Sequence, residues 1–120
     1  MEALERYREA LDIFTVLQNP FCIAGTLNDM GRLFVDIGAY DEAKDALIQS
    51  VKIAECIGEK QVAAADYNEL GRLSESQSDF ISAKEWFAKA LSMLDIWDER
   101  NVAVARRNLE RVTAQINGGK

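Results

Sequence analysis

The chain has 120 residues, the size of one domain, and a composition with 48% hydrophobic and 28% charged residues excludes a disordered segment. Its formal net charge of −6 argues against a nucleic-acid partner, because the densest basic stretch is too small to offset that charge: Arg106, Arg107, Arg111 and Lys120. The absence of histidine excludes histidine catalysis and histidine-ligated metals, and no apolar run approaches the ~18 residues of a membrane span.

The apolar pattern predicts helices along the whole chain. Apolar and small residues recur at alternating spacings of four and three, as in the stripe Ala43, Leu47, Ser50, Ala54 and Ile57. Turn and capping residues separate these stretches. In chain order, the expected helices are 2–18, 21–37, 41–57, 61–77, 80–96 and 99–116.

A repeat of 40 residues relates these helices to one another. The string LNDMGRL at 27–33 returns as YNELGRL at 67–73. Gly31 and Gly71 lie inside helical patterns, where glycine costs ~1 kcal/mol relative to alanine, so we expect a neighbouring helix too close for a side chain there. The repeat divides one domain of residues 1–120 into an incomplete repeat at 1–18, repeats at 21–57 and 61–97, and a terminal helix at 99–116.

This pattern resembles the tetratricopeptide repeat family, in the variety spaced by 40 residues that occurs in kinesin light chains and bacterial regulatory arrays. The residues that carry the resemblance are Leu27, Met30, Gly31, Phe34, Tyr40, Ala43, Leu47 and Ser50, then Tyr67, Leu70, Gly71, Phe80, Ala83, Phe87 and Ala90. The resemblance implies an all-α fold, an α-solenoid of antiparallel helix hairpins with a right-handed superhelical twist. It also implies a protein–protein interaction module that binds a peptide or a partner protein.

The sequence departs from the repeat pattern at three places. Ser74 stands where the first repeat has Phe34, so we expect the second hairpin to be less well filled. Glu110 and Arg111 replace Leu70 and Gly71, which marks a terminal helix. The third place is residues 1–18, which correspond to the second helix of a hairpin.

The missing partner of this first helix has a consequence for its surface. Its stripe of Ala3, Tyr7, Ala10, Phe14 and Leu17 is expected to pack on the second helix. Leu4, Leu11 and Val16 would then be exposed. Either the chain is a piece of a longer array, or another chain covers this strip, for which a homodimer through the first helix is one arrangement.

Buried positions follow from the same stripes. We expect close helix contacts at Ala43 and Ala83, and burial of Met30, Leu47, Tyr67, Leu70 and Phe87. Cys22 and Cys56 fall at apolar positions, which predicts two small buried side chains in a reducing cytoplasm rather than a redox or zinc motif.

The concave side of such a superhelix, formed by the first helix of each repeat, is the candidate binding groove. The residues expected there are Asn28, Asp29, Arg32, Asp36, Asn68, Glu69, Arg72, Glu75 and Asn108, with Ser76 beside them. Asparagine can donate to and accept from a peptide backbone, and arginine can hold a carboxylate. Alternatively these residues form a solvated surface, with Arg32 paired to Asp29 or Asp36 along one helix. The acidic residues dilute the arginines, so the carboxylate-binding specificity of chaperone-binding family members is not expected here.

Two other classes of function are weighed against peptide binding. The carboxylate pairs Asp29 with Asp36 and Glu69 with Glu75 have no apolar surroundings, nucleophile or phosphate loop beside them, so we expect neither an enzyme nor a cofactor. A self-assembling scaffold without a peptide ligand is the stronger alternative. It would use the first helix and the outward-facing Trp86, whereas Trp97 follows the core stripe.

Overall fold

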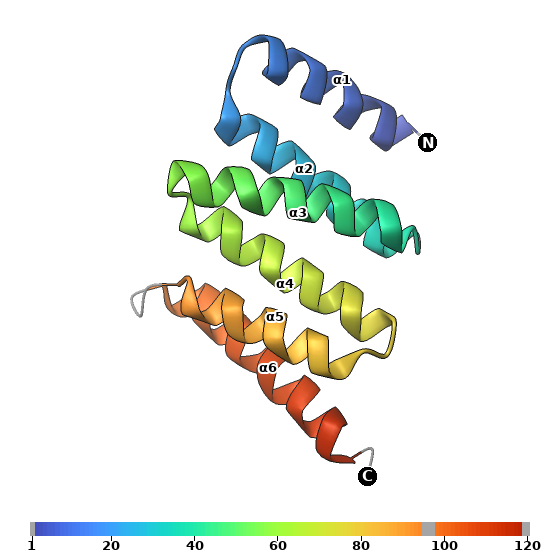
Figure 1. Ribbon diagram of the computed structural model, residues 1–120, viewed down its shortest axis with the longest axis vertical. Helices are drawn as coiled ribbons and strands as arrows, with labels where there is room; N and C mark the ends of the chain where they lie inside the picture. Colours follow the sequence, from blue (N-terminus) through green and yellow to red (C-terminus); the bar gives the residue numbers. More distant parts are fainter. Residues whose placement is uncertain (1, 95–97, 119–120) are drawn as a thin grey trace.

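The computed structural model describes residues 2–94 and 98–118, and this part of the chain is helical without any β-strand. Six helices stack one after another along the longest axis, with α1 at one end and α6 at the other (Figure 1). Their bounds are α1 Glu2–Val16, α2 Pro20–Asp36, α3 Tyr40–Ile57, α4 Lys60–Ser76, α5 Phe80–Ser92 and α6 Glu99–Gly118. The predicted all-α fold of about six helices is confirmed.

Local signals set most helix boundaries. The side chain of Asn19 accepts a hydrogen bond from the Cys22 amide at 3.2 Å, with Pro20 in the first turn of α2. Gly58 ends α3 with a φ of 77°, a left-handed conformation that favours glycine. Asp79 caps α5 by accepting from the Ser82 amide at 3.1 Å.

The predicted end of the fifth helix at residue 96 is not what the structure shows. The helix α5 ends at Ser92, because the amides of Met93 and Leu94 bond to the carbonyls of Ala90 and Leu91, three residues back, each at 3.2 Å. This tighter pattern closes the last turn and turns the chain toward α6.

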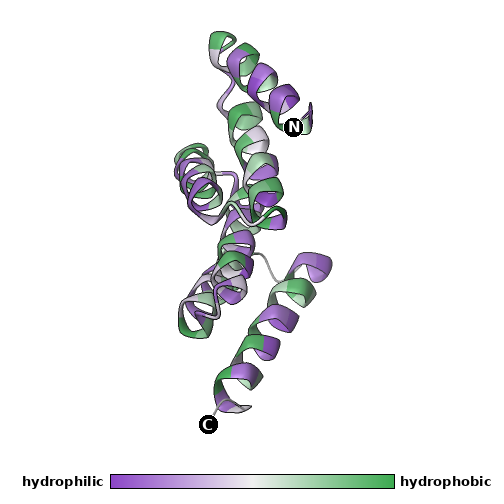
Figure 2. Cartoon of the chain, turned by 90° about the vertical axis from the view of Figure 1, so that its right-hand side faces the viewer, coloured by the Kyte–Doolittle hydropathy of each residue, from purple (hydrophilic) through white to green (hydrophobic). Residues whose placement is uncertain are grey.

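Each helix packs against the helix that follows it, and α2 also contacts α4. The molecule is therefore elongated, with extents of 50 × 34 × 19 Å. The end helices α1 and α6 each carry hydrophilic and hydrophobic stretches, as Figure 2 shows in purple and green. The contact between α2 and α4 brings the first helices of the two repeats side by side, which the candidate groove requires.

The core follows the predicted stripes. Leu47 and Phe87 are fully buried, and they lie over Gly31 and Gly71 respectively. A Cβ atom on Gly31 would come within 2.5 Å of Cδ2 of Leu47, and one on Gly71 would collide with the ring of Phe87. The expected close approach at both glycines is confirmed, as is the burial of the other predicted core residues: Met30, Ala43, Tyr67, Leu70 and Ala83.

The exposed strip predicted on the first helix is largely wrong. Leu4 and Leu11 are partly buried and pack against the core beside Tyr7, because α1 turns this side toward α2. Val16 is exposed, at 82%, as predicted. Beside it in the sequence, at the α1–α2 turn, further apolar side chains are exposed: Ile13, Leu17 and Phe21.

Two further expectations, those for the cysteines and for Trp86, differ from the structure. Cys56 is exposed and Cys22 only partly buried, since Cys56 falls on the outer side of α3, two residues past the buried Ala54. Trp86 does not face outward but stacks on Tyr67, with ring centroids 5.8 Å apart. Trp97 lies outside the described residues.

Candidate functional site

A hollow of about 350 Å³ lies on α2, α4 and α6, and it contains most of the predicted groove residues. Its lining consists of Asn28, Arg32, Ala65, Asn68, Glu69, Arg72, Val104 and Asn108. Asp29 and Asp36 instead line a neighbouring hollow of about 270 Å³ between α1 and α2, which shares Arg32. We call the first of these hollows the inner groove.

Ion pairs between helices cross the inner groove. Arg72 on α4 donates to Asp36 on α2 at 2.6 Å and lies 3.1 Å from Glu69 on its own helix. Arg32 on α2 lies 3.6 Å from Glu69. The arginines thus join neighbouring helices, and the alternative of Arg32 pairing along its own helix is not what the structure shows.

A second bridge of the same kind joins α4 to α6. Arg111 donates two hydrogen bonds to the carboxylate of Glu75, at 2.8 and 2.9 Å, and a third to Asn108 at 3.0 Å. Glu75 was among the residues expected in the groove, but Arg111 was not predicted to be its partner. The signal was present, because Asp36–Arg72 and Glu75–Arg111 are both separated by 36 residues.

Two acceptor atoms in the inner groove have no hydrogen-bond partner among the described residues. They are Oδ1 of Asn68 and Oε2 of Glu69, and both atoms are buried. Oε2 of Glu69 lies 3.1 Å from Nη1 of Arg72 but outside hydrogen-bonding geometry. Burial raises the pKa of Glu69, and the nearby Arg72 and Arg32 oppose this rise. The two acceptor atoms are thus covered by neighbouring atoms of residues that line the groove, whereas the arginines of the groove already have carboxylate partners.

Asn28 takes a different role from the predicted one. Its side-chain amide donates to Oδ1 of Asp66 at 2.6 Å, and Ser50 on α3 lies 2.6 Å from Oδ2 of the same carboxyl. Desolvation in this buried position raises the pKa of Asp66 to about 7, although Ser50 and Asn28 lower it. Sequence analysis missed Asp66. Its position in α4, between the buried Ala63 and Leu70, was the available signal.

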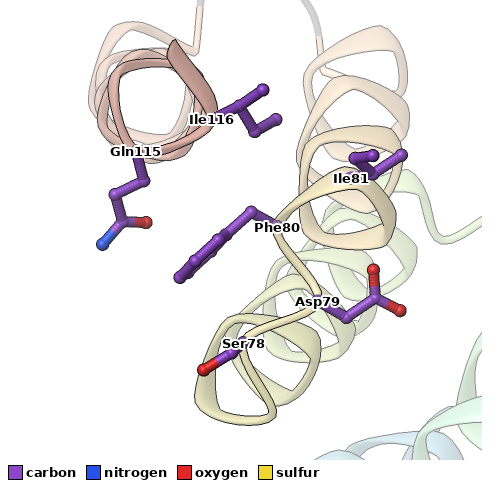
Figure 3. A pocket seen from close by; sticks show the side chains of 6 residues that line it. All are labelled: Ser78, Asp79, Phe80, Ile81, Gln115 and Ile116. Carbon is purple, nitrogen blue, oxygen red and sulfur yellow. The ribbon is translucent and has the colours of Figure 1, made fainter. Parts of the chain in front are cut away.

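Another hollow, of about 400 Å³, lies near the C-terminal end of α6. Phe80 and Ile116 project between α5 and α6 there, while Gln115, Ser78 and Asp79 lie around its edge (Figure 3). The Asp79 carboxylate is already engaged as the cap of α5. The inner groove is the stronger candidate for recognition, because it combines concavity with polar atoms that lack partners.

Within the described residues, no group of three or more potential metal ligands gathers in one place. In the described part of the chain, no helix has the length and apolar character that a membrane crossing requires.

Comparison with known proteins identifies the repeat. The family model described as tetratricopeptide repeat matches residues 24–55, which span most of the α2–α3 hairpin. None of the curated proteins matches the chain. Tetratricopeptide repeats mediate protein–protein interactions. The matched hairpin recurs 40 residues later as α4 and α5, where Gly71 lies against Phe87 as Gly31 lies against Leu47. Residues 24–55 of the chain are therefore identified as a tetratricopeptide repeat.

Proposed function

We propose that this chain is a non-catalytic binding module whose inner groove holds an extended segment of a partner protein. The observation that carries the proposal is that two buried acceptors make no hydrogen bond among the described residues, Oδ1 of Asn68 and Oε2 of Glu69, the second of which lies in the ion pair with Arg72. A buried polar atom that makes no hydrogen bond costs ~1–3 kcal/mol. A ligand that supplies N–H groups at this place would remove that cost.

A polypeptide fits this requirement. Its backbone carries an N–H donor at each residue other than proline, so one extended segment can reach Asn68 on α4 and continue toward Asn108 on α6. The paired state of Arg72 and Arg111 argues against a site built for a terminal carboxylate, because such a ligand would have to displace Asp36 or Glu75. We therefore infer recognition through donors on the ligand.

The test uses peptides selected against the wild-type chain from a displayed random library. Calorimetry on the best peptide should show affinity at least ~10-fold weaker for Asn68→Ala, equivalent to the loss of about one buried hydrogen bond. The free energy of unfolding of this variant should not fall below that of wild type, because the substitution removes a buried acceptor that makes no hydrogen bond among the described residues. Lys52→Ala, at an exposed position on α3, is the matched control and should bind normally. Equal affinity for Asn68→Ala and wild type would move the interface away from the groove.

Self-association is the second candidate, and the exposed apolar side chains at the α1–α2 turn favour it. Val16 is 82% exposed, Leu17 66% and Phe21 52%. Sedimentation equilibrium should detect a concentration-dependent dimer of the wild type that Val16→Glu/Leu17→Glu abolishes. Ile81→Glu alters an equally exposed residue on α5 and should leave the dimer intact. A wild type that stays monomeric at high micromolar concentration would exclude this candidate.

A further inference from the structure

Asp66 lies at the junction of three helices with no exposed surface. Its Oδ1 accepts a hydrogen bond from Asn28 on α2, and its Oδ2 lies 2.6 Å from the Ser50 hydroxyl on α3. That hydroxyl also lies 2.9 Å from the carbonyl oxygen of Ala24 on α2. Among the described residues, no lysine or arginine forms an ion pair with Asp66.

The number of hydrogens in this cluster depends on the ionisation state of Asp66. The Ser50 hydroxyl has one hydrogen but two oxygen neighbours, Oδ2 of Asp66 and the carbonyl of Ala24. If Asp66 is ionised, one of these two contacts has no hydrogen and brings two acceptors together. If Asp66 is protonated, it donates to Ser50 and Ser50 donates to Ala24, so every contact contains a hydrogen. The geometry thus fits the neutral acid.

We propose that Asp66 is a neutral carboxylic acid in the folded protein, and that loss of its proton weakens the junction of α2, α3 and α4. The fold then becomes less stable as the pH rises.

The charged groups around Asp66 also favour its neutral form. On α4, the Glu69 carboxylate disfavours a negative charge on Asp66. On α2, Arg32 pairs with Glu69. On α3, Glu55 accepts a hydrogen bond from Tyr67. No neighbouring element supplies a cation that pairs with Asp66, and burial raises its pKa to about 7.

The direction of the pH effect follows from proton linkage. An unfolded aspartate has a pKa of ~3.9. Between that value and about 7, the folded chain keeps a proton that the unfolded chain has lost. The contribution of Asp66 to the free energy of unfolding is therefore fully present below pH ~4, declines as the pH rises and levels off above pH ~7. From pH 5 to pH 7 this single group changes the unfolding equilibrium constant by roughly 50-fold.

The experiment compares wild type with Asp66→Asn, in the full chain. The amide of asparagine can still donate to Ser50 while its oxygen accepts from Asn28, so this variant imitates the neutral acid without titrating. Urea unfolding is measured from pH 5 to pH 8. The ratio of the wild-type to the variant unfolding constant should rise by roughly 50-fold between pH 5 and pH 7. Asp12→Asn, at an exposed position on α1, makes the same chemical substitution and should give a constant ratio.

A ratio that is constant or falls with pH for Asp66→Asn would overturn the proposal. Carboxyl ¹³C NMR on the wild type keeps the test decisive if the variant does not fold. A resonance of Asp66 that titrates near pH 7 supports the neutral acid, whereas one that titrates below pH 5 refutes it.

Discussion

Gly71→Ala should destabilise the protein, although alanine is the better helix former. A Cβ atom at residue 71 would lie 2.5 Å from Cδ1 and 2.7 Å from Cζ of Phe87, whose ring is fully buried and cannot move away. By contrast, a Cβ atom on Gly25 in α2 would meet no atom within 4 Å. The two substitutions are chemically identical and differ only in the space available.

The two effects at Gly71 have opposite signs. Inserting a methyl group into a packed core costs ~1–3 kcal/mol, and more where the neighbour is rigid. Alanine in a helix interior recovers ~1 kcal/mol. The net expectation is a loss of ~1–2 kcal/mol for Gly71→Ala and a gain of ~0.5–1 kcal/mol for Gly25→Ala. In a Phe87→Ala background the collision is absent, so Gly71→Ala should then stabilise by up to ~1 kcal/mol.

Urea unfolding followed by far-UV circular dichroism measures all four variants under one condition. The decisive observation is the change of sign between the two backgrounds, because general effects of alanine on helix stability act equally in both. A stabilising Gly71→Ala in the wild-type background would show that α5 does not lie as close to α4 as the structure places it.

Two further predictions concern packing and electrostatics. Phe87→Ala should lower the free energy of unfolding in urea by ~3–5 kcal/mol. Tyr7→Ala, at the equivalent but partly exposed position of α1, should cost less than half as much. Similar losses for the two variants would contradict the stripe assignment. Glu75→Gln should lower stability by ~0.5–1 kcal/mol, because the bridge to Arg111 is partly exposed and screened by solvent. That loss should shrink in 1 M NaCl, and a loss unaffected by salt would mean that the bridge contributes by packing instead.

The fold could be predicted from the sequence because its determinants are local. Asn19, Asp79 and Gly58 act within a few residues of the helix ends that they define. The close approach of a neighbouring helix at Gly31 and Gly71 could also be predicted, because glycine is unfavourable inside a helix and no turn or cap explains either residue. These signals repeat after 40 residues, so each occurrence supported the other.

The candidate site was less predictable because its contacts depend on how helices meet. Asn28 lines the inner groove, but its side-chain amide donates to Asp66, which is 38 residues away in the sequence. Asp66 itself could not be distinguished from a surface aspartate by residue type alone. Likewise, the orientation of α1 was misjudged for Leu4 and Leu11, since the first helix was assumed to pack through the same stripe as α3.

The nearest-neighbour packing of the helices has a kinetic consequence. Each helix contacts the next one along the chain, and the longer steps from α2 to α4 and from α4 to α6 pass over one helix each. Forming these contacts closes short loops, which carry a low entropic cost, and topologies of this kind fold in microseconds to milliseconds. Folding can begin at any hairpin and spread to its neighbours. We expect the α2–α3 and α4–α5 hairpins, which bury Leu47 and Phe87 fully, to begin folding most often.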